Sequence, residues 1–122
     1  MANNALIKSS SDYGDTWTTI LTLEDDSYYP VIKECLNMVM VCYYILKDGS
    51  DYHIRFIKSV DYGTNWSSPT TKISDVLFGS LGIEKTHYNY IPLTYWLKDV
   101  TDKQFLQKFS VSGDLIGSPI EI

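Results

Sequence analysis

The stretch Ser59-Val60-Asp61-Tyr62-Gly63-Thr64-Asn65-Trp66 decides the fold, because the chain carries a near-copy of it further upstream. Ser10-Ser11-Asp12-Tyr13-Gly14-Asp15-Thr16-Trp17 lies 49 positions earlier and matches at the Ser, Asp, Tyr, Gly and Trp positions. A fixed spacing of this size is typical of repeat architectures, in which each repeat is one supersecondary unit. The sequence therefore predicts a chain built from recurring units.

Each copy is interpreted as a turn between two antiparallel strands. The Asp early in the turn can accept hydrogen bonds from backbone N–H groups a few residues on. The Gly is expected at positive φ, and the Trp ring is expected to fold back against its hairpin, with the small Ser beneath it. The residues with these structural roles are Ser10, Asp12, Gly14, Trp17, Ser59, Asp61, Gly63 and Trp66.

Metal binding is the rival interpretation of the first copy, since Asp12 and Asp15 offer oxygen ligands. A calcium loop needs several acidic ligands, and the second copy has Thr64 where the first has Asp15. We therefore predict no metal site.

The rest of the chain predicts an all-β fold of antiparallel hairpins, because period-2 alternation and β-branched or aromatic runs dominate and no 3.6-residue period is present. Met38–Leu46 is apolar almost throughout, as expected of an inner strand covered on both faces. The predicted strands are Ala5–Ser9, Trp17–Leu23, Tyr28–Lys33, Met38–Leu46, Tyr52–Lys58, Ser67–Ile73, Lys85–Ile91, Leu93–Lys98, Gln104–Val111 and Gly117–Ile122, with Phe78–Gly82 as a connector.

A third, altered copy of the motif follows at Ser110-Val111-Ser112-Gly113, with Ser112 in place of Asp and Ile116 in place of Trp. The motif hairpins then lie near residues 5–23, 52–73 and 104–122, with two connecting hairpins between them. Since no linker divides the 122 residues, we predict a single domain over 1–122.

Composition excludes several classes of protein. The net charge is −5, Arg55 is the single arginine, and no basic cluster is present, which argues against nucleic-acid binding. The apolar run Met38–Leu46 is too short to span a bilayer. Met1–Lys8 lacks the apolar core of a signal peptide, so a cytoplasmic or virion-associated protein is expected. Cys35 and Cys42 are not expected to face each other as a disulfide.

The pattern S-x-D-x-G-x-x-W resembles the Asp box of BNR-repeat, sialidase-like β-propellers, and Tyr43–Pro69 resembles one propeller blade. The resemblance implies blades of four antiparallel strands and boxes that lie away from any active site. At one blade per 49 residues, the chain holds about two and a half blades, which cannot close a ring. Completion by a homo-oligomer, membership of a larger propeller, and a compact arrangement that is not a propeller all remain open.

Function is less specified than fold. Sialidases of the resembling family hold the substrate carboxylate with three arginines, and the lone Arg55 argues against that activity. His53 and His87 do not suggest a zinc site, and no cofactor motif is present. We therefore expect a non-catalytic structural or adhesion module that acts as an oligomer, such as a phage or viral virion component. One alternative is a glycan-binding module, and a second is a truncated sialidase-like glycoside hydrolase. The candidate glycan-binding residues are Tyr88, Tyr90, Tyr95 and Trp96.

Overall fold

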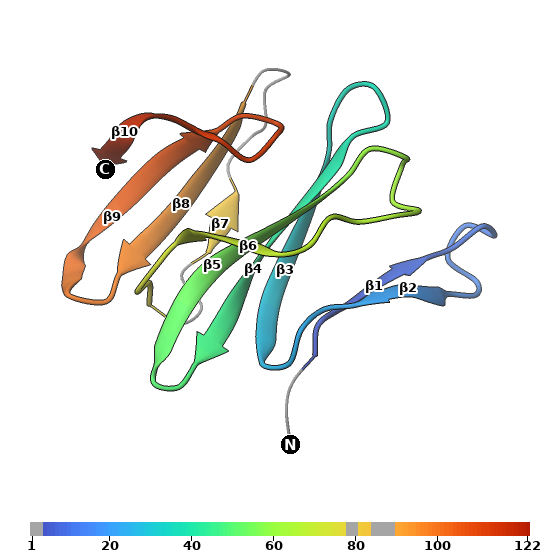
Figure 1. Ribbon diagram of the computed structural model, residues 1–122, viewed down its shortest axis with the longest axis horizontal. Helices are drawn as coiled ribbons and strands as arrows, with labels where there is room; N and C mark the ends of the chain where they lie inside the picture. The colour runs from blue at the N-terminus through green and yellow to red at the C-terminus, as the bar shows by residue number, and fades with distance from the viewer. Residues whose placement is uncertain (1–3, 78–80, 84–89) are drawn as a thin grey trace.

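The computed structural model describes residues 4–77, 81–83 and 90–122, which form ten β-strands and no helix (Figure 1). The strands are β1 (Leu6–Ser9), β2 (Thr18–Thr22), β3 (Ser27–Glu34), β4 (Met40–Asp48), β5 (Asp51–Ser59), β6 (Thr70–Ile73), β7 (Gly82–Ile83), β8 (Ile91–Leu97), β9 (Val100–Phe109) and β10 (Leu115–Glu121). The predicted all-β fold class is therefore confirmed.

The strands form three antiparallel sheets in which neighbours in space are neighbours in sequence. The first sheet is the hairpin β1–β2, the middle sheet has the order β3-β4-β5-β6, and the last sheet has the order β7-β8-β9-β10. Each four-stranded sheet is thus a connecting hairpin followed by a motif hairpin. No closed barrel or propeller is formed by the described residues.

The β4–β5 hairpin sets the register of the middle sheet. The two strands pair without interruption from Met40↔Ser59 to Asp48↔Asp51. Gly49 takes a φ of 63° at the first position of the two-residue turn. A residue with a Cβ would adopt this positive φ only at an energetic cost. Short hairpin turns of this kind have a twist that matches the twist of the flanking strands.

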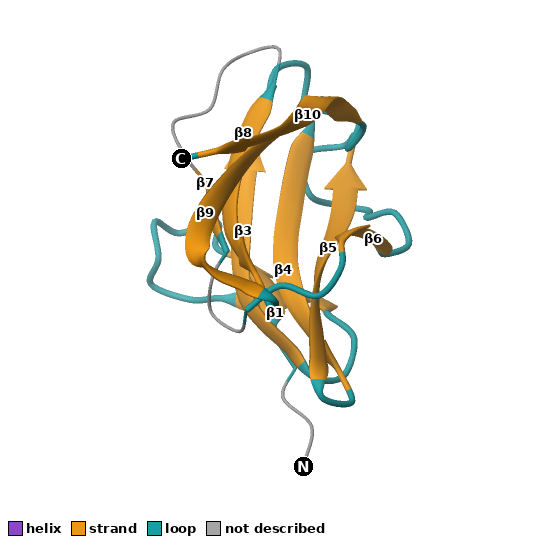
Figure 2. Cartoon of the chain, turned by 90° about the vertical axis from the view of Figure 1, so that its left-hand side faces the viewer, coloured by secondary structure: helices purple, strands orange, loops and turns teal. Residues whose placement is uncertain are grey.

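Side chains on the two faces of β4 enter two separate cores. Tyr43 and its odd-numbered neighbour Val41 pack with Phe56 and with the last sheet, in a cluster that includes Leu93 and Phe109. Tyr44 and Cys42 pack with Ile7 and Leu23 of the first hairpin. The middle sheet is therefore covered on both faces, as the apolar run predicts, and the molecule has three layers (Figures 1 and 2).

Several predicted boundaries differ from the structure. The strand predicted over Lys85–Ile91 lies mostly outside the described residues, and β8 begins at Ile91. The predicted connector Phe78–Gly82 was wrong at its end, because Gly82 belongs to β7 and pairs with Thr94. Residues 67–69 were predicted as the start of a strand, but β6 begins at Thr70. Ser67 instead exchanges hydrogen bonds with Lys58 through its backbone N–H and its side chain. Both cysteines are free thiols, as predicted.

Candidate functional site

The two motif turns have the same hydrogen-bond geometry. In the second turn Ser59 Oγ donates to Asp61 Oδ1 at 2.8 Å and accepts the Gly63 N–H at 2.8 Å. Asp61 also accepts the backbone N–H of Asn65 at 2.8 Å and its side-chain amide at 2.7 Å. Trp66 Nε1 donates to the Gly63 carbonyl at 3.0 Å. These side-chain bonds close the turn together with the backbone bond from the Thr64 N–H to the Asp61 carbonyl at 3.4 Å.

The first turn repeats this set with one change of donor. Ser10 Oγ donates to Asp12 and accepts the Gly14 N–H, both at 2.8 Å. Asp12 accepts the Thr16 N–H and the Thr16 hydroxyl, which replaces the Asn65 amide. Trp17 Nε1 donates to the Gly14 carbonyl at 3.0 Å. Gly14 and Gly63 have φ of 94° and 91°, as predicted for the glycine of the motif.

These donors keep both aspartates ionised. Hydrogen bonds from the side chain and backbone of Thr16 lower the pKa of Asp12 to about 2. Hydrogen bonds from the backbone and side chain of Asn65 lower the pKa of Asp61 to about 2. A carboxylate that accepts several N–H and O–H donors is stabilised in its charged form. Both carboxylates are therefore occupied as turn acceptors.

The two turns differ in what surrounds them. Trp66 is half-buried and packs against the core between the first and middle sheets. Trp17 is 59% exposed, although its ring lies beside Gly14. The expectation that the ring fills a gap beside its hairpin therefore fits Trp66 better than Trp17, because the first turn has fewer neighbours.

The third motif turn keeps the serine and the glycine but lacks the aspartate and the tryptophan. Ser110 Oγ accepts the N–H groups of Ser112 at 3.3 Å and Asp114 at 3.1 Å, which are the same two offsets as in the other turns. Gly113 has a φ of 88° and lies directly against the Phe56 ring. This turn therefore packs onto the middle sheet.

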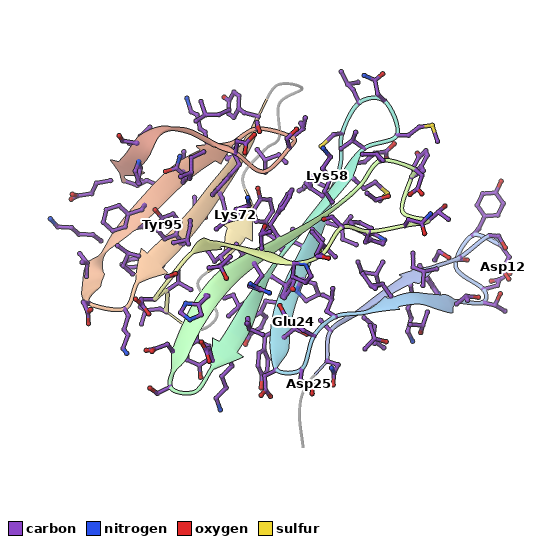
Figure 3. All side chains as sticks on the ribbon, in the orientation of Figure 1. Asp12, Glu24, Asp25, Lys58, Lys72 and Tyr95 are labelled. Carbon is purple, nitrogen blue, oxygen red and sulfur yellow. The ribbon has the colours of Figure 1, made fainter. Side chains whose placement is uncertain are left out.

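A hollow of about 510 Å³ opens where the third turn approaches the second one. Its floor includes Phe56, and its walls come from β5, β6, the second turn and Ser112. The lining residues are Phe56, Lys58, Val60, Asp61, Asn65, Trp66, Ser67, Ser68, Thr70, Lys72 and Ser112. Figure 3 labels Lys58 and Lys72, which come from β5 and β6 of the middle sheet.

Two ammonium groups and the Asp61 carboxylate line the hollow, so its charge is positive on balance. Lys58 Nζ is 3.5 Å from Ser112 Oγ, and Lys72 Nζ is 5.2 Å from the centroid of the Phe56 ring. Neither lysine forms an ion pair with another described residue, whereas Lys98 and Lys103 pair with Asp51 and Glu121. A mixed apolar and polar hollow with unpaired cations suits an anion that also carries an apolar body.

A second polar cluster joins the first sheet to the middle sheet. Arg55 donates to both oxygens of Glu24, at 2.8 and 3.3 Å, and Tyr44 donates its hydroxyl to Glu24 at 2.6 Å. Burial opposes ionisation of Glu24, but the bonds from Arg55 and Tyr44 lower its pKa overall. Burial and the neighbouring Glu24 raise the pKa of Tyr44.

A tyrosine beside a glutamate could act as a nucleophile, but the geometry of this cluster argues against that role. The Tyr44 side chain has no exposed surface, and its raised pKa opposes formation of the phenolate that an attack on substrate would need. The lone Arg55 is engaged by Glu24 and by Thr71. The cluster therefore holds two layers together.

The described members of the predicted glycan-binding set, Tyr90, Tyr95 and Trp96, do not form one exposed surface. Tyr95 is 3% exposed and stacks against Phe105, so its assignment to a glycan surface was wrong. The Tyr90 ring lies 5.0 Å from Lys108 Nζ, and Trp96 is half-buried. Tyr88 lies outside the described residues. Tyr95 faces inward because it lies opposite Phe105 on the core side of β8 and β9.

Other reactive groups are also accounted for by packing. His53 Nδ1 accepts the backbone N–H of Asp75 at 3.1 Å. Burial raises the pKa of Cys42 to about 12, which makes it a core thiol and not a nucleophile. No group of residues suited to hold a metal ion is found in the described part of the chain. The same part contains no helix with the length and apolar character needed to cross a membrane.

Comparison with known proteins returned no matching family model, no matching curated protein and no matching solved structure. The resemblance to Asp-box proteins rests on the sequence motif and its spacing, and it stays a prediction. Sequence reasoning also missed the hollow, since Lys58 and Ser112 meet there across 54 positions of the chain. The third motif copy at Ser110 was the available signal that this segment returns to the second turn.

Proposed function

We propose that the chain is a non-catalytic structural module of blade-like sheets that works by stacking against further sheets. The observation that carries this proposal is the difference between the middle and outer layers. The middle sheet buries both faces, while each outer sheet has one face against the middle sheet and another without a described partner. Sheets of a propeller stack face to face in the same way.

The outward faces of the outer sheets carry apolar side chains. On the last sheet Ile116 lies opposite Lys108 and Ile120 lies opposite Leu106, and the two isoleucines are 41% and 52% exposed. On the first hairpin Leu6 and Ile20 are 44% and 39% exposed. Exposed apolar faces of this kind mark interaction surfaces. Because the two faces differ, association between copies would be head-to-tail and would form a ring or a filament.

We expect the chain to form an oligomer that Ile116→Lys with Ile120→Lys dissociates. Two ammonium groups in a dry sheet-to-sheet contact would lose their hydration without gaining partners. Light scattering after size-exclusion chromatography measures the mass, and the expected result is a shift of the double variant to the monomer mass with an unchanged circular dichroism spectrum.

Leu115→Lys is the matched control, because Leu115 is 60% exposed on the same strand and pairs with Phe109, which places it on the other side of β10. This variant should keep the wild-type mass. A wild-type chain that is monomeric at high micromolar concentration would contradict the proposed function.

Glycan binding is a second candidate function, favoured by the hollow beside the second turn. Its unpaired Lys58 and Lys72 could bind a carboxylate, and the hydroxyls of Ser68 and Thr70 are suited to sugar hydroxyls. The class of ligand that fits these groups best is an acidic saccharide. The proposed binding site is therefore this hollow and not the surface that the sequence predicts around Tyr95.

Lys58→Met combined with Lys72→Met should lower affinity for glucuronate at least tenfold, because both charge-assisted contacts are lost. Titration followed by NMR chemical shifts measures the affinity, with glucose as the neutral probe. Lys47→Met is the control, since Lys47 is exposed on β4 and does not line the hollow. Equal shifts with glucose and glucuronate, or none with either, would argue against this candidate.

A further inference from the structure

The first hairpin has the place of the second half of a four-stranded unit. In the middle sheet the motif turn connects β5 to β6, the third and fourth strands, and in the last sheet the corresponding turn connects β9 to β10. The first motif turn connects β1 to β2. By this correspondence β1 and β2 are third and fourth strands, and no described strand holds the positions of a first and second strand beside β1.

The middle sheet shows what a complete unit places at those positions. There β4 pairs with β5 along its whole length. The loop between β3 and β4 and the end of β3 also support the motif turn: the Tyr62 N–H donates to the Met38 carbonyl of the loop at 2.9 Å, and the Tyr62 hydroxyl donates to Glu34, the last residue of β3, at 2.6 Å. The Met40 sulfur lies against Gly63. The tyrosine of the motif is thus a docking residue for the hairpin formed by the first two strands.

Tyr13 has nearly the same φ as Tyr62 and lacks these contacts. Its φ is 58°, against 61° for Tyr62, so both tyrosines are held in a backbone region that is unusual for residues other than glycine. Tyr13 is 107% exposed and has no hydrogen bond or ring contact with any described residue. The turn therefore presents a docking residue with nothing docked on it, at the outer end of the first hairpin (Figure 1).

The cover of the middle sheet is also incomplete on this side. Ile32 lies opposite Cys42 and so belongs to the face on which Cys42 packs against Ile7 and Leu23. Cys42 is fully buried, but Ile32 is 37% exposed. The two-stranded first layer thus leaves apolar surface over β3, where a wider first sheet would cover it.

We propose that the outer edge of β1 is a binding site for a two-stranded β-hairpin of the same kind as β3–β4, supplied by polypeptide other than residues 4–122. Its second strand would pair antiparallel with β1, as β4 pairs with β5. Its loop would present a backbone carbonyl to the Tyr13 N–H and a carboxylate to the Tyr13 hydroxyl. This inference rests on the proposed function, since it names the partner that completes the first layer. Addition of strands to an open edge is a common mode of recognition, with affinity from backbone hydrogen bonds.

A fusion that supplies the missing hairpin tests the proposal. A second copy of residues 27–50 is joined directly in front of residue 2, which reproduces the spacing of the middle sheet because Ala2 stands 49 positions before Asp51. Hydrogen–deuterium exchange then reports on the Leu6–Ser9 amides. The expected result is exchange at least tenfold slower than in a control fusion that carries the same added residues in scrambled order.

The second arm addresses the tyrosine. In the fused chain Tyr13→Ala should make the exchange of the Leu6–Ser9 amides faster again, though not as fast as in the control fusion. In the unfused chain the same substitution should leave their exchange rate unchanged. Equal exchange in the native and scrambled fusions would overturn the proposal. The mass of the unfused chain is measured alongside, so that a monomer counts against the proposed function and unchanged exchange counts against the β1 edge.

Discussion

Gly113→Ala is expected to destabilise the chain by about 2–5 kcal/mol, since it combines backbone strain of about 1–2 kcal/mol with overpacking of about 1–3 kcal/mol. Gly113 has a φ of 88°, and a Cβ at this position would lie 2.6 Å from Cε1 of Phe56. The Phe56 ring cannot move away at low cost, because it is 5% exposed and packs 5.0 Å from the Tyr43 ring. Urea unfolding followed by tryptophan fluorescence measures the loss.

Gly117→Ala separates the two contributions. Gly117 also has a positive φ, 69°, but no atom lies within 4 Å of the position its Cβ would take. This control should therefore lose about 1 kcal/mol, from backbone strain alone. Equal losses in the two variants would show that the third turn does not pack on Phe56. The hollow between the third and second turns would then lack the wall that the third turn provides.

The parts of the fold that sequence predicts are those set by neighbouring residues. Alternation along β3, β5 and β9 and the Asp48-Gly49 turn define hairpins within short stretches of chain. The apolar run of β4 indicates two covered faces. It does not indicate which segments cover them, because Ile7 and Leu93 reach opposite faces of β4 from distant parts of the chain. Layer order is therefore a property of packing, and the sequence pattern leaves it open.

The same distinction explains the site. The hydrogen bonds that the Asp12 and Asp61 carboxylates accept span at most four residues, so both aspartates could be assigned as acceptors from spacing alone. Tyr95 was misplaced because alternation in Tyr95-Trp96 shows that one side chain faces the core without showing which one. Pairing of Tyr95 with Phe105 settles the choice, and that pairing depends on a hairpin register set by the β8–β9 turn.

Tyr43→Ala and Tyr44→Ala are each expected to cost about 3–5 kcal/mol, as for other losses of a fully buried aromatic ring. The two residues are neighbours on β4, and neither has exposed surface. Tyr43 packs toward the last sheet, where its ring is 5.4 Å from that of Phe109, and Tyr44 packs toward the first hairpin. Large losses at both positions, measured by urea unfolding, are the signature of a middle layer. If one face of the middle sheet were exposed to solvent, only one of the two substitutions would destabilise the chain strongly.

The phenylalanine variants of the same pair should differ in sign. The Tyr44 hydroxyl donates to the Glu24 carboxylate, and a hydrogen bond to a charged group contributes about 1.5–3 kcal/mol, so Tyr44→Phe should destabilise by about that amount. The Tyr43 hydroxyl is buried and has no hydrogen-bond partner among the described residues. Because an unsatisfied buried hydroxyl costs about 1–3 kcal/mol, Tyr43→Phe should leave stability unchanged or raise it. A loss at Tyr43→Phe as large as that at Tyr44→Phe would mean that the hydroxyl has a partner, and that the layer facing the last sheet is wetter than its packing indicates.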